Sequence, residues 1–182
     1  MADKLVYFFG NNEAEGKGDQ RELLGGKGAN LAEMDRIGIP VPPGFTIGTA
    51  SCIDYLKSPV IGDQLRNEVA EAIAHVEKVM GKKYADPADP MLFSCRSGAK
   101  VSMPGMMDTV LNIGLNDESV KGLIAKSGNE RFAYDSYRRL IQMYGDVVMG
   151  VHGEHFEDAI DAIKTKCGVK LDTELGVQDL KD

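Results

Sequence analysis

Apolar residues recur at every third or fourth position in several stretches of the chain, which is the spacing of an amphipathic helix. The longest of these stretches covers residues 63–80. Its apolar row consists of Leu65, Val69, Ile73, Val76 and Met80. The same spacing predicts helices over residues 118–126, 130–148 and 155–166, so the second half of the chain is expected to be mainly helical.

Short apolar runs bounded by glycine and proline dominate the first half of the chain. They predict strands over residues 5–9, 45–47, 91–95 and 109–113. Helical patterns separate these runs, and such alternation indicates the α/β class.

The pattern changes near Gly114, and this change suggests two parts. Residues 1–115 have the α/β (α+β) texture, and residues 116–182 have the helical one. The last residues, 172–182, begin a further helical pattern that stops without an evident cap or closing turn. We therefore expect an α/β domain followed by a helical subdomain that is interrupted, as in a piece of a longer protein.

The composition and the charge of the chain exclude several classes of protein. The chain has 182 residues, of which 43% are hydrophobic and 27% charged, as in a globular protein of one domain or slightly more. No apolar run approaches the ~20 residues that a membrane helix needs. The net charge of −7 argues against a nucleic-acid or anionic-membrane partner, because such proteins carry an excess of positive charge.

Cysteine use and the N-terminal residues predict a cytoplasmic protein. Cys52, Cys95 and Cys167 are odd in number, far apart and without a Cys-x-x-Cys pair, so neither a disulfide framework nor a zinc site is indicated. The first residues lack the basic and apolar regions of a secretory signal.

Residues 24–28, Leu-Gly-Gly-Lys-Gly, open an amphipathic stretch that Gly38 is placed to end. Glycines here would let backbone N–H groups approach an anion, the helix N-terminus favours negative charge, and Lys27 adds a mobile positive charge. These are the parts of a phosphate-binding loop. The alternative is an ordinary turn that contains a lysine, since neither the Walker A pattern nor Gly-x-Gly-x-x-Gly is present.

Two later segments carry further candidate chemistry. Arg96 follows a predicted buried strand, where a guanidinium can bind phosphate oxygens through two hydrogen bonds or can form a surface ion pair. The loop at residues 100–108 places Met103, Met106 and Met107 around Pro-Gly. We expect these methionines to cover something apolar, either a neighbouring core or the base and ribose of a nucleotide when the loop closes.

Five segments carry recognisable motifs. They are residues 24–34 (LGGKGANLAEM), 40–47 (PVPPGFTI), 96–99 (RSGA), 102–117 (SMPGMMDTVLNIGLND) and 129–146 (NERFAYDSYRRLIQMYGD). With these motifs the chain resembles, along nearly its whole length, the N-terminal nucleotide-binding region of the pyruvate, phosphate dikinase family. The Met-Pro-Gly-Met-Met-Asp-Thr block is the most specific of the matches.

The resemblance implies an ATP-grasp fold, in which two α/β lobes clamp ATP. Residues 1–115 would form the first lobe, and residues 116–182 a helical subdomain after it. By motif, Lys27 and Arg96 would bind the ATP phosphates in one cleft, and the loop around Gly105 would fold over them. The nucleotide-binding residues implied in this way are Lys27, Arg96, Met103, Gly105, Asp108 and Thr109.

The resemblance also implies an activity for the whole protein. Members of the family interconvert ATP, phosphate and pyruvate with AMP, pyrophosphate and phosphoenolpyruvate, through a phosphohistidine on another domain. We therefore expect a cytoplasmic transferase that uses ATP and Mg²⁺ and forms a homodimer. The second lobe, with the magnesium ligands, and the phosphohistidine motif have no counterpart in the sequence, so no catalytic residue or metal ligand is assigned here and the chain alone is expected to be inactive.

Two alternatives belong to other classes. The phosphoenolpyruvate synthases (pyruvate, water dikinases) share the Gly-Gly-Lys and Pro-Pro-Gly-Phe elements, but typically carry Arg-Ser-Ser-Ala and a Phe-Ala-Gly-Gln loop. Arg-Ser-Gly-Ala at residues 96–99 and the methionine loop favour the phosphate-using enzyme. The other alternative is a non-catalytic nucleotide-binding or interaction module that acts alone.

Overall fold

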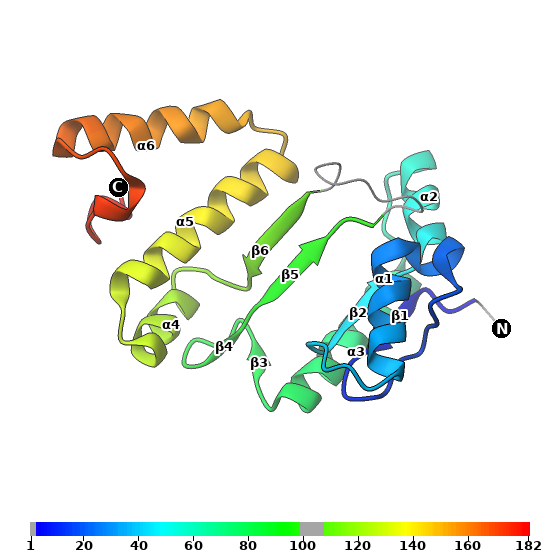
Figure 1. The fold of residues 1–182 in the computed structure, drawn as a ribbon. Coiled ribbons are helices and arrows are strands. Elements are labelled where there is room, and N and C mark those ends of the chain that lie inside the picture. The colour runs from blue at the N-terminus through cyan, green and yellow to red at the C-terminus, as the bar shows by residue number, and fades with distance from the viewer. Residues whose placement is uncertain (1–2, 99–107) are drawn as a thin grey trace. The chain divides into compact units, whose positions relative to one another are not determined.

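The computed structural model describes residues 3–98 and 108–182 and shows a mixed α and β fold (Figure 1). The fold divides into two compact units. Unit 1 consists of Met1–Gly81 and Ser97–Met107, and unit 2 of Lys82–Arg96 and Asp108–Asp182. The strand at residues 109–113 packs on the helix at residues 130–147 within unit 2.

Unit 1 is built on a two-stranded antiparallel sheet with a helix pair. Its main elements are β1 (Val6–Phe9), α1 (Arg21–Arg36), β2 (Gly44–Ile47) and α3 (Asp63–Met80). Phe8 lies opposite Phe45 in the strand register. Both helices contact both strands, and Val6, Phe8 and Val76 are buried. Helix α3 has the bounds that its apolar spacing predicts, which confirms that prediction.

Helix α1 ends where its sequence pattern predicts. Gly38 has a φ of 81°, in the left-handed region that favours glycine. The N–H of Gly38 donates to the carbonyl oxygen of Asp35 at 3.0 Å, and the N–H of Ile39 donates to that of Met34 at 2.9 Å. This pair of bonds is a Schellman motif, which satisfies carbonyl groups of the last helical turn.

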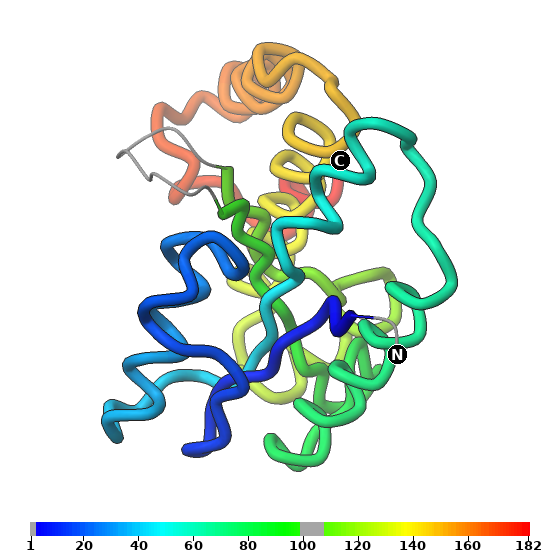
Figure 2. The backbone as a smooth tube through the Cα atoms, turned by 90° about the vertical axis from the view of Figure 1, so that its right-hand side faces the viewer, coloured from blue at the N-terminus to red at the C-terminus, as the bar shows by residue number. Residues whose placement is uncertain are grey.

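Helix α2 (Thr49–Lys57) was not among the elements that the pattern predicts. None of its residues is buried, so no apolar face of this helix packs into a core. The hydroxyl of Thr49 donates to the carbonyl oxygen of Glu22 at 2.5 Å and joins the start of α2 to α1. Figure 2 shows the connection from α2 to α3 as an extended segment.

The strands of unit 2 differ from the predicted ones. The short strands β3 (Lys83–Tyr84) and β4 (Pro90–Met91) pair in parallel, and β5 (Phe93–Arg96) pairs with β6 (Thr109–Ile113) in antiparallel fashion. The prediction of one buried strand over residues 91–95 was wrong. The chain changes partner at Leu92, and Ser94 and Cys95 are exposed because this hairpin has only two strands.

The helices of unit 2 lie close to their predicted bounds. They are α4 (Ser119–Ser127), α5 (Glu130–Val147) and α6 (Gly153–Cys167), followed by the short 3-10 helix η1 (Asp172–Glu174). Helix α5 contacts β6, α4 and α6 (Figure 1). Val110, Leu115 and Leu140 form the centre of a hydrophobic core between β6 and α5. In the two described ranges, no helix combines the length and the apolar character needed to cross a bilayer.

Candidate nucleotide-binding site

Lys27 lies beside a break inside helix α1. Gly25 has φ 69° and ψ 169°, so α1 consists of a short helical segment before Gly25 and a longer one after it. The expectation of a glycine-rich loop that leads into a helix is therefore corrected. The chain is already helical from Arg21, and a single glycine redirects it. Lys27 is thus in the first turn of the second segment.

Close packing fixes the second segment of α1 on the sheet. A Cβ atom added to Gly28 would lie only 2.7 Å from Cγ2 and 2.8 Å from Oγ1 of Thr46 on β2. No side chain fits in that space, so the glycine allows the helix to approach the strand. The next residue, Ala29, is fully buried. The backbone that carries Lys27 is therefore held by β2.

The side chain of Lys27 is half-buried and has a backbone partner. Its Nζ donates to the carbonyl oxygen of Ser97 at 3.3 Å, within unit 1. Ser97 directly follows Arg96 in the chain. An ammonium group has three N–H donors, so this one bond leaves donors for an anion.

The structure brings three other predicted residues together in unit 2. Arg96 is the last residue of β5, and it lies opposite Thr109, the first residue of β6. Asp108 directly precedes β6, and both Arg96 and Asp108 are exposed. These residues mark one end of the β5–β6 hairpin. Met103 and Gly105 lie outside the described residues.

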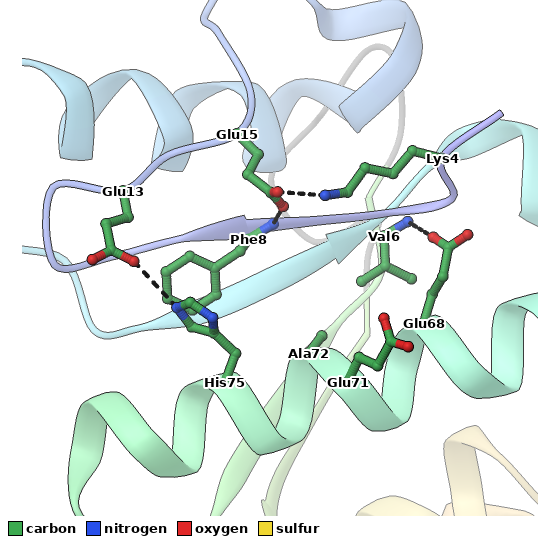
Figure 3. Close-up of a pocket in the computed structure, with 9 residues that line it drawn as sticks. All are labelled: Lys4, Val6, Phe8, Glu13, Glu15, Glu68, Glu71, Ala72 and His75. Carbon is green, nitrogen blue, oxygen red and sulfur yellow. Dashed lines mark hydrogen bonds and ion pairs between the residues drawn. The ribbon is translucent and has the colours of Figure 1, made fainter. Parts of the chain in front are cut away.

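Unit 1 also contains a pocket of about 450 Å³. It lies between β1, α3 and the segment that follows β1 (Figure 3). Its lining residues are Lys4, Val6, Phe8, Glu13, Glu15, Glu68, Glu71, Ala72 and His75. None of them is a predicted nucleotide-binding residue. The ring of His75 packs on that of Phe8, with centroids 4.0 Å apart, and its Nε2 lies 3.2 Å from the carboxylate of Glu13.

Two carboxylates of this pocket bind the backbone of β1. Glu68 accepts hydrogen bonds from the N–H groups of Leu5 and Val6 at 2.7 and 2.9 Å, and Glu15 accepts one from Phe8 at 2.7 Å (Figure 3). Desolvation alone would raise the pKa of Glu68. The bonds from the Gln64 side chain and from both N–H groups outweigh it, so the pKa is lowered. The sequence did not indicate these roles of Glu68 and Glu15, because residues that bond across as many as 63 positions leave no local pattern.

Acidic residues here do not form a metal centre. Among the residues that the structure describes, no group of three or more His, Cys, Asp or Glu side chains is placed to hold a metal ion.

Comparison with known proteins gives the relationships of the chain. Residues 21–68 match the family model of the pyruvate phosphate dikinase AMP/ATP-binding domain, and this segment includes Lys27. Over 180 residues the chain is 54% identical to pyruvate, phosphate dikinase of Clostridium symbiosum, which covers 98% of the chain and 20% of that protein. The identity to the enzyme of Rhizobium meliloti is 56% over 173 residues, covering 94% of the chain and 19% of the relative.

A plant relative is similar to the same degree. The chloroplastic pyruvate, phosphate dikinase 1 of Arabidopsis thaliana is 52% identical over 183 residues, covering 100% of the chain and 19% of the relative. The chain thus spans about a fifth of the length of the curated relatives it matches. With more than half of its residues identical along nearly its whole length, the chain is similar to a segment of the pyruvate, phosphate dikinases that includes their AMP/ATP-binding domain.

Proposed function

We propose that this chain is the ATP-binding part of a pyruvate, phosphate dikinase. The observation that carries this proposal is the match of residues 21–68 to the AMP/ATP-binding domain model, a segment that spans the break in α1 and includes Lys27. In this proposal residues 1–115 are the first lobe of an ATP-grasp domain, and residues 116–182 are a helical subdomain. The mixed α and β structure is compatible with such a lobe.

The proposed phosphate ligands are Lys27 and Arg96. Lysine supplies a compact charge on a flexible stem, whereas arginine supplies a planar fork that can bind two phosphate oxygens at once. Phosphoryl transfer needs such cations, because charge on the phosphoryl oxygens must be neutralised while the group moves. Met103, Gly105, Asp108 and Thr109 are proposed to complete the nucleotide site from the adjoining loop and strand.

The parent enzyme is proposed to convert ATP, phosphate and pyruvate to AMP, pyrophosphate and phosphoenolpyruvate, and the reverse, through a phosphohistidine on another domain. The part played by this chain is to bind and orient the phosphates of ATP. Mg²⁺ bound with ATP would neutralise phosphate charge, and we assign its protein ligands to a second lobe outside these residues. A homodimer and a cytoplasmic location are further proposals, although some relatives are chloroplastic.

Titration of the chain with Mg-ATP tests the proposal. Half of a clamp leaves the phosphates in contact with water, where a charge pair about 4 Å apart contributes only ~1 kcal/mol. We expect a dissociation constant of about 1 mM or higher, measured by NMR, and no dikinase turnover. Lys27→Ala should weaken binding roughly tenfold, whereas Lys17→Ala, in the exposed segment before α1, should leave it unchanged.

Two results would contradict the proposal. Absence of any saturable ATP binding by the folded chain would mean that it is not an ATP-binding part. Micromolar binding would mean that a complete site exists within these residues and that no second lobe is needed.

A further inference from the structure

The backbone of Gly25 is exceptional within helix α1. Its φ of 69° and ψ of 169° make it the non-helical residue inside the 16-residue helix. This combination belongs to a region that is essentially restricted to glycine, because a Cβ atom of an L-residue clashes with the backbone there. A side chain at this position would force the chain into another path.

Packing on both sides fixes the two segments that Gly25 joins. Before the break, Leu24 is 3% exposed and packs on Gly16, where an added Cβ would lie 2.3 Å from Cδ1 of Leu24. After the break, Gly28 is in close contact with Thr46, as described above. The turn between two anchored segments must therefore be made by one residue.

A hydrogen bond from another helix supports the break. In a continuous helix the carbonyl of Glu22 would point along the axis to the N–H four residues later, that of Gly26. In the structure this carbonyl accepts a hydrogen bond from the hydroxyl group of Thr49. The start of α2 thus binds the first segment of α1 at the turn where the helix is interrupted.

The break determines where the side chain of Lys27 begins, because Lys27 lies in the first turn of the second segment, two residues after Gly25. We propose that Gly25 is a positioning residue of the nucleotide site, which holds Lys27 where its ammonium group reaches the ATP phosphates. This inference rests on the proposed function and adds a residue that acts through Lys27.

The test compares two glycine substitutions in the same helix. Gly25→Ala introduces a Cβ at the break, and Gly38→Ala introduces one at the C-terminal end, where φ is 81° and nothing lies within 4 Å of the added atom. Both variants carry backbone strain, so both should unfold at a lower temperature. Only Gly25→Ala should move the NMR signal of ¹³C-methylated Lys27, which Lys27→Arg identifies by its loss.

Binding supplies the second readout, with inorganic tripolyphosphate and Mg-ATP as separate probes. Gly25→Ala should weaken both about tenfold, because a hydrogen bond to a charged group is lost. Gly38→Ala should bind both as the unaltered chain does. Equal losses for the two probes indicate that phosphate contacts, not base contacts, depend on Gly25.

A third variant separates backbone geometry from bulk. Synthetic residues 1–51 can be ligated to residues 52–182 through Cys52, which allows a D-alanine at position 25. D-alanine adds the same methyl group but accepts a positive φ, so it should keep the Lys27 signal and the affinity. It also provides a folded comparison if Gly25→Ala does not fold.

The outcomes distinguish this inference from the proposed function. An unchanged Lys27 signal and unchanged affinity in folded Gly25→Ala would overturn the positioning role and leave the proposed function intact. Loss of affinity with D-alanine as well would also overturn it, because bulk would then be the cause. No ATP binding by the unaltered chain would contradict the proposed function, whereas the Lys27 signal would still report the geometry.

Discussion

At the scale of single residues, a buried carboxylate shapes the loop after β1. Asp35 on α1 is 3% exposed and accepts hydrogen bonds from the N–H groups of Gly10 and Asn12, both at 3.0 Å. Gly10, Asn11 and Asn12 all have positive φ values, of 113°, 58° and 61°. The carboxylate thus compensates for a loop backbone that few residues adopt readily.

Loss of this carboxylate should destabilise unit 1. We expect Asp35→Ala to lower the free energy of unfolding by about 3 kcal/mol, because the buried N–H group of Gly10 and the partly buried one of Asn12 lose a charged acceptor. Asp35→Asn keeps one acceptor and should cost roughly half as much. Asp19→Ala, at an exposed position, should change stability by less than about 0.5 kcal/mol. Urea denaturation measures all three, and an unaffected Asp35→Ala would contradict the role.

A second residue-scale prediction concerns Arg96. Since it is exposed and lies at the end of β5, it contributes little to the core. In the full-length enzyme, Arg96→Ala should reduce turnover by orders of magnitude, because the charge of the moving phosphoryl group loses a cation. The melting temperature should stay within about 1 °C. An early-melting variant with normal specific activity would make Arg96 a structural ion-pair residue instead.

Residue types and spacing identified Lys27 as a candidate because lysine among glycines is a local signal. The role of Asp35 had no such signal, since its partners lie 25 and 23 positions away in sequence. The residues on either side of Gly25 are likewise fixed by distant parts of the chain, since Leu24 packs on Gly16 and Gly28 on Thr46. The sequence therefore indicated Lys27 as a charged candidate, but not the packing that fixes the backbone of this residue.

At the scale of elements, helices with a long apolar row could be predicted well. The bounds of α3 were predicted correctly, and α5 ends within one residue of the expected position. Helix α2 and the two-residue strand β3 were missed, because neither has a buried row or enough length for periodicity. The residues around the break in α1 were predicted to form a glycine-rich loop. The sequence does not show which of its glycines has the unusual dihedral angles.

The contact between α5 and α6 leads to a prediction at this scale. A Cβ added to Gly145 on α5 would lie 2.4 Å from Cζ of Phe156 on α6. Alanine normally stabilises a helix by ~1 kcal/mol relative to glycine. We nevertheless expect Gly145→Ala to lower stability by about 1 kcal/mol, because the ring must be displaced.

A double-mutant cycle measures this contact. Phe156→Leu removes the far end of the ring and should cost about 1 kcal/mol by itself. In the double variant the added methyl group fits the space that the ring leaves, so the combined loss should be smaller than the sum of the single losses. Strict additivity, or a more stable Gly145→Ala, would show that the two helices are not in tight contact there.

At the scale of the whole molecule, carboxylates held by hydrogen bonds are distributed over both units. Glu68 is in unit 1, and Asp135 on α5 is in unit 2. Desolvation alone would raise the pKa of Asp135, but the guanidinium groups of Arg139 and Arg138 outweigh it and lower the pKa. A sequence cannot predict these shifts, because they depend on which cations and N–H groups the fold brings near.

The lowered pKa values predict how stability depends on pH. A carboxyl group that is more acidic in the folded state stabilises the fold above its unfolded pKa, 3.8 for Asp and 4.5 for Glu. This contribution is lost as the pH falls through the folded-state pKa. The melting temperature should therefore be level just above pH 4.5 and fall below pH 3.8.

Asp135→Asn provides the control for this pH dependence. The variant should melt earlier than the unaltered chain above pH 3.8, and the difference should shrink as the pH falls through the lowered folded-state pKa of Asp135, below which the aspartic acid is neutral like asparagine. Differential scanning calorimetry from acid to neutral pH measures it. A difference that is the same at every pH would mean that the charge of Asp135 does not contribute.

The carboxylates of Glu68 and Glu15 also decide what strand β1 can do in a crowded solution. In the described part of the chain β1 pairs only with β2, and an outer strand with unsatisfied N–H groups is a template for another molecule. Here the outward N–H groups of Leu5, Val6 and Phe8 are already occupied by side chains. By occupying these N–H groups, Glu68 and Glu15 remove the donors with which this edge of β1 could pair with another molecule, and so they disfavour edge-to-edge aggregation at β1.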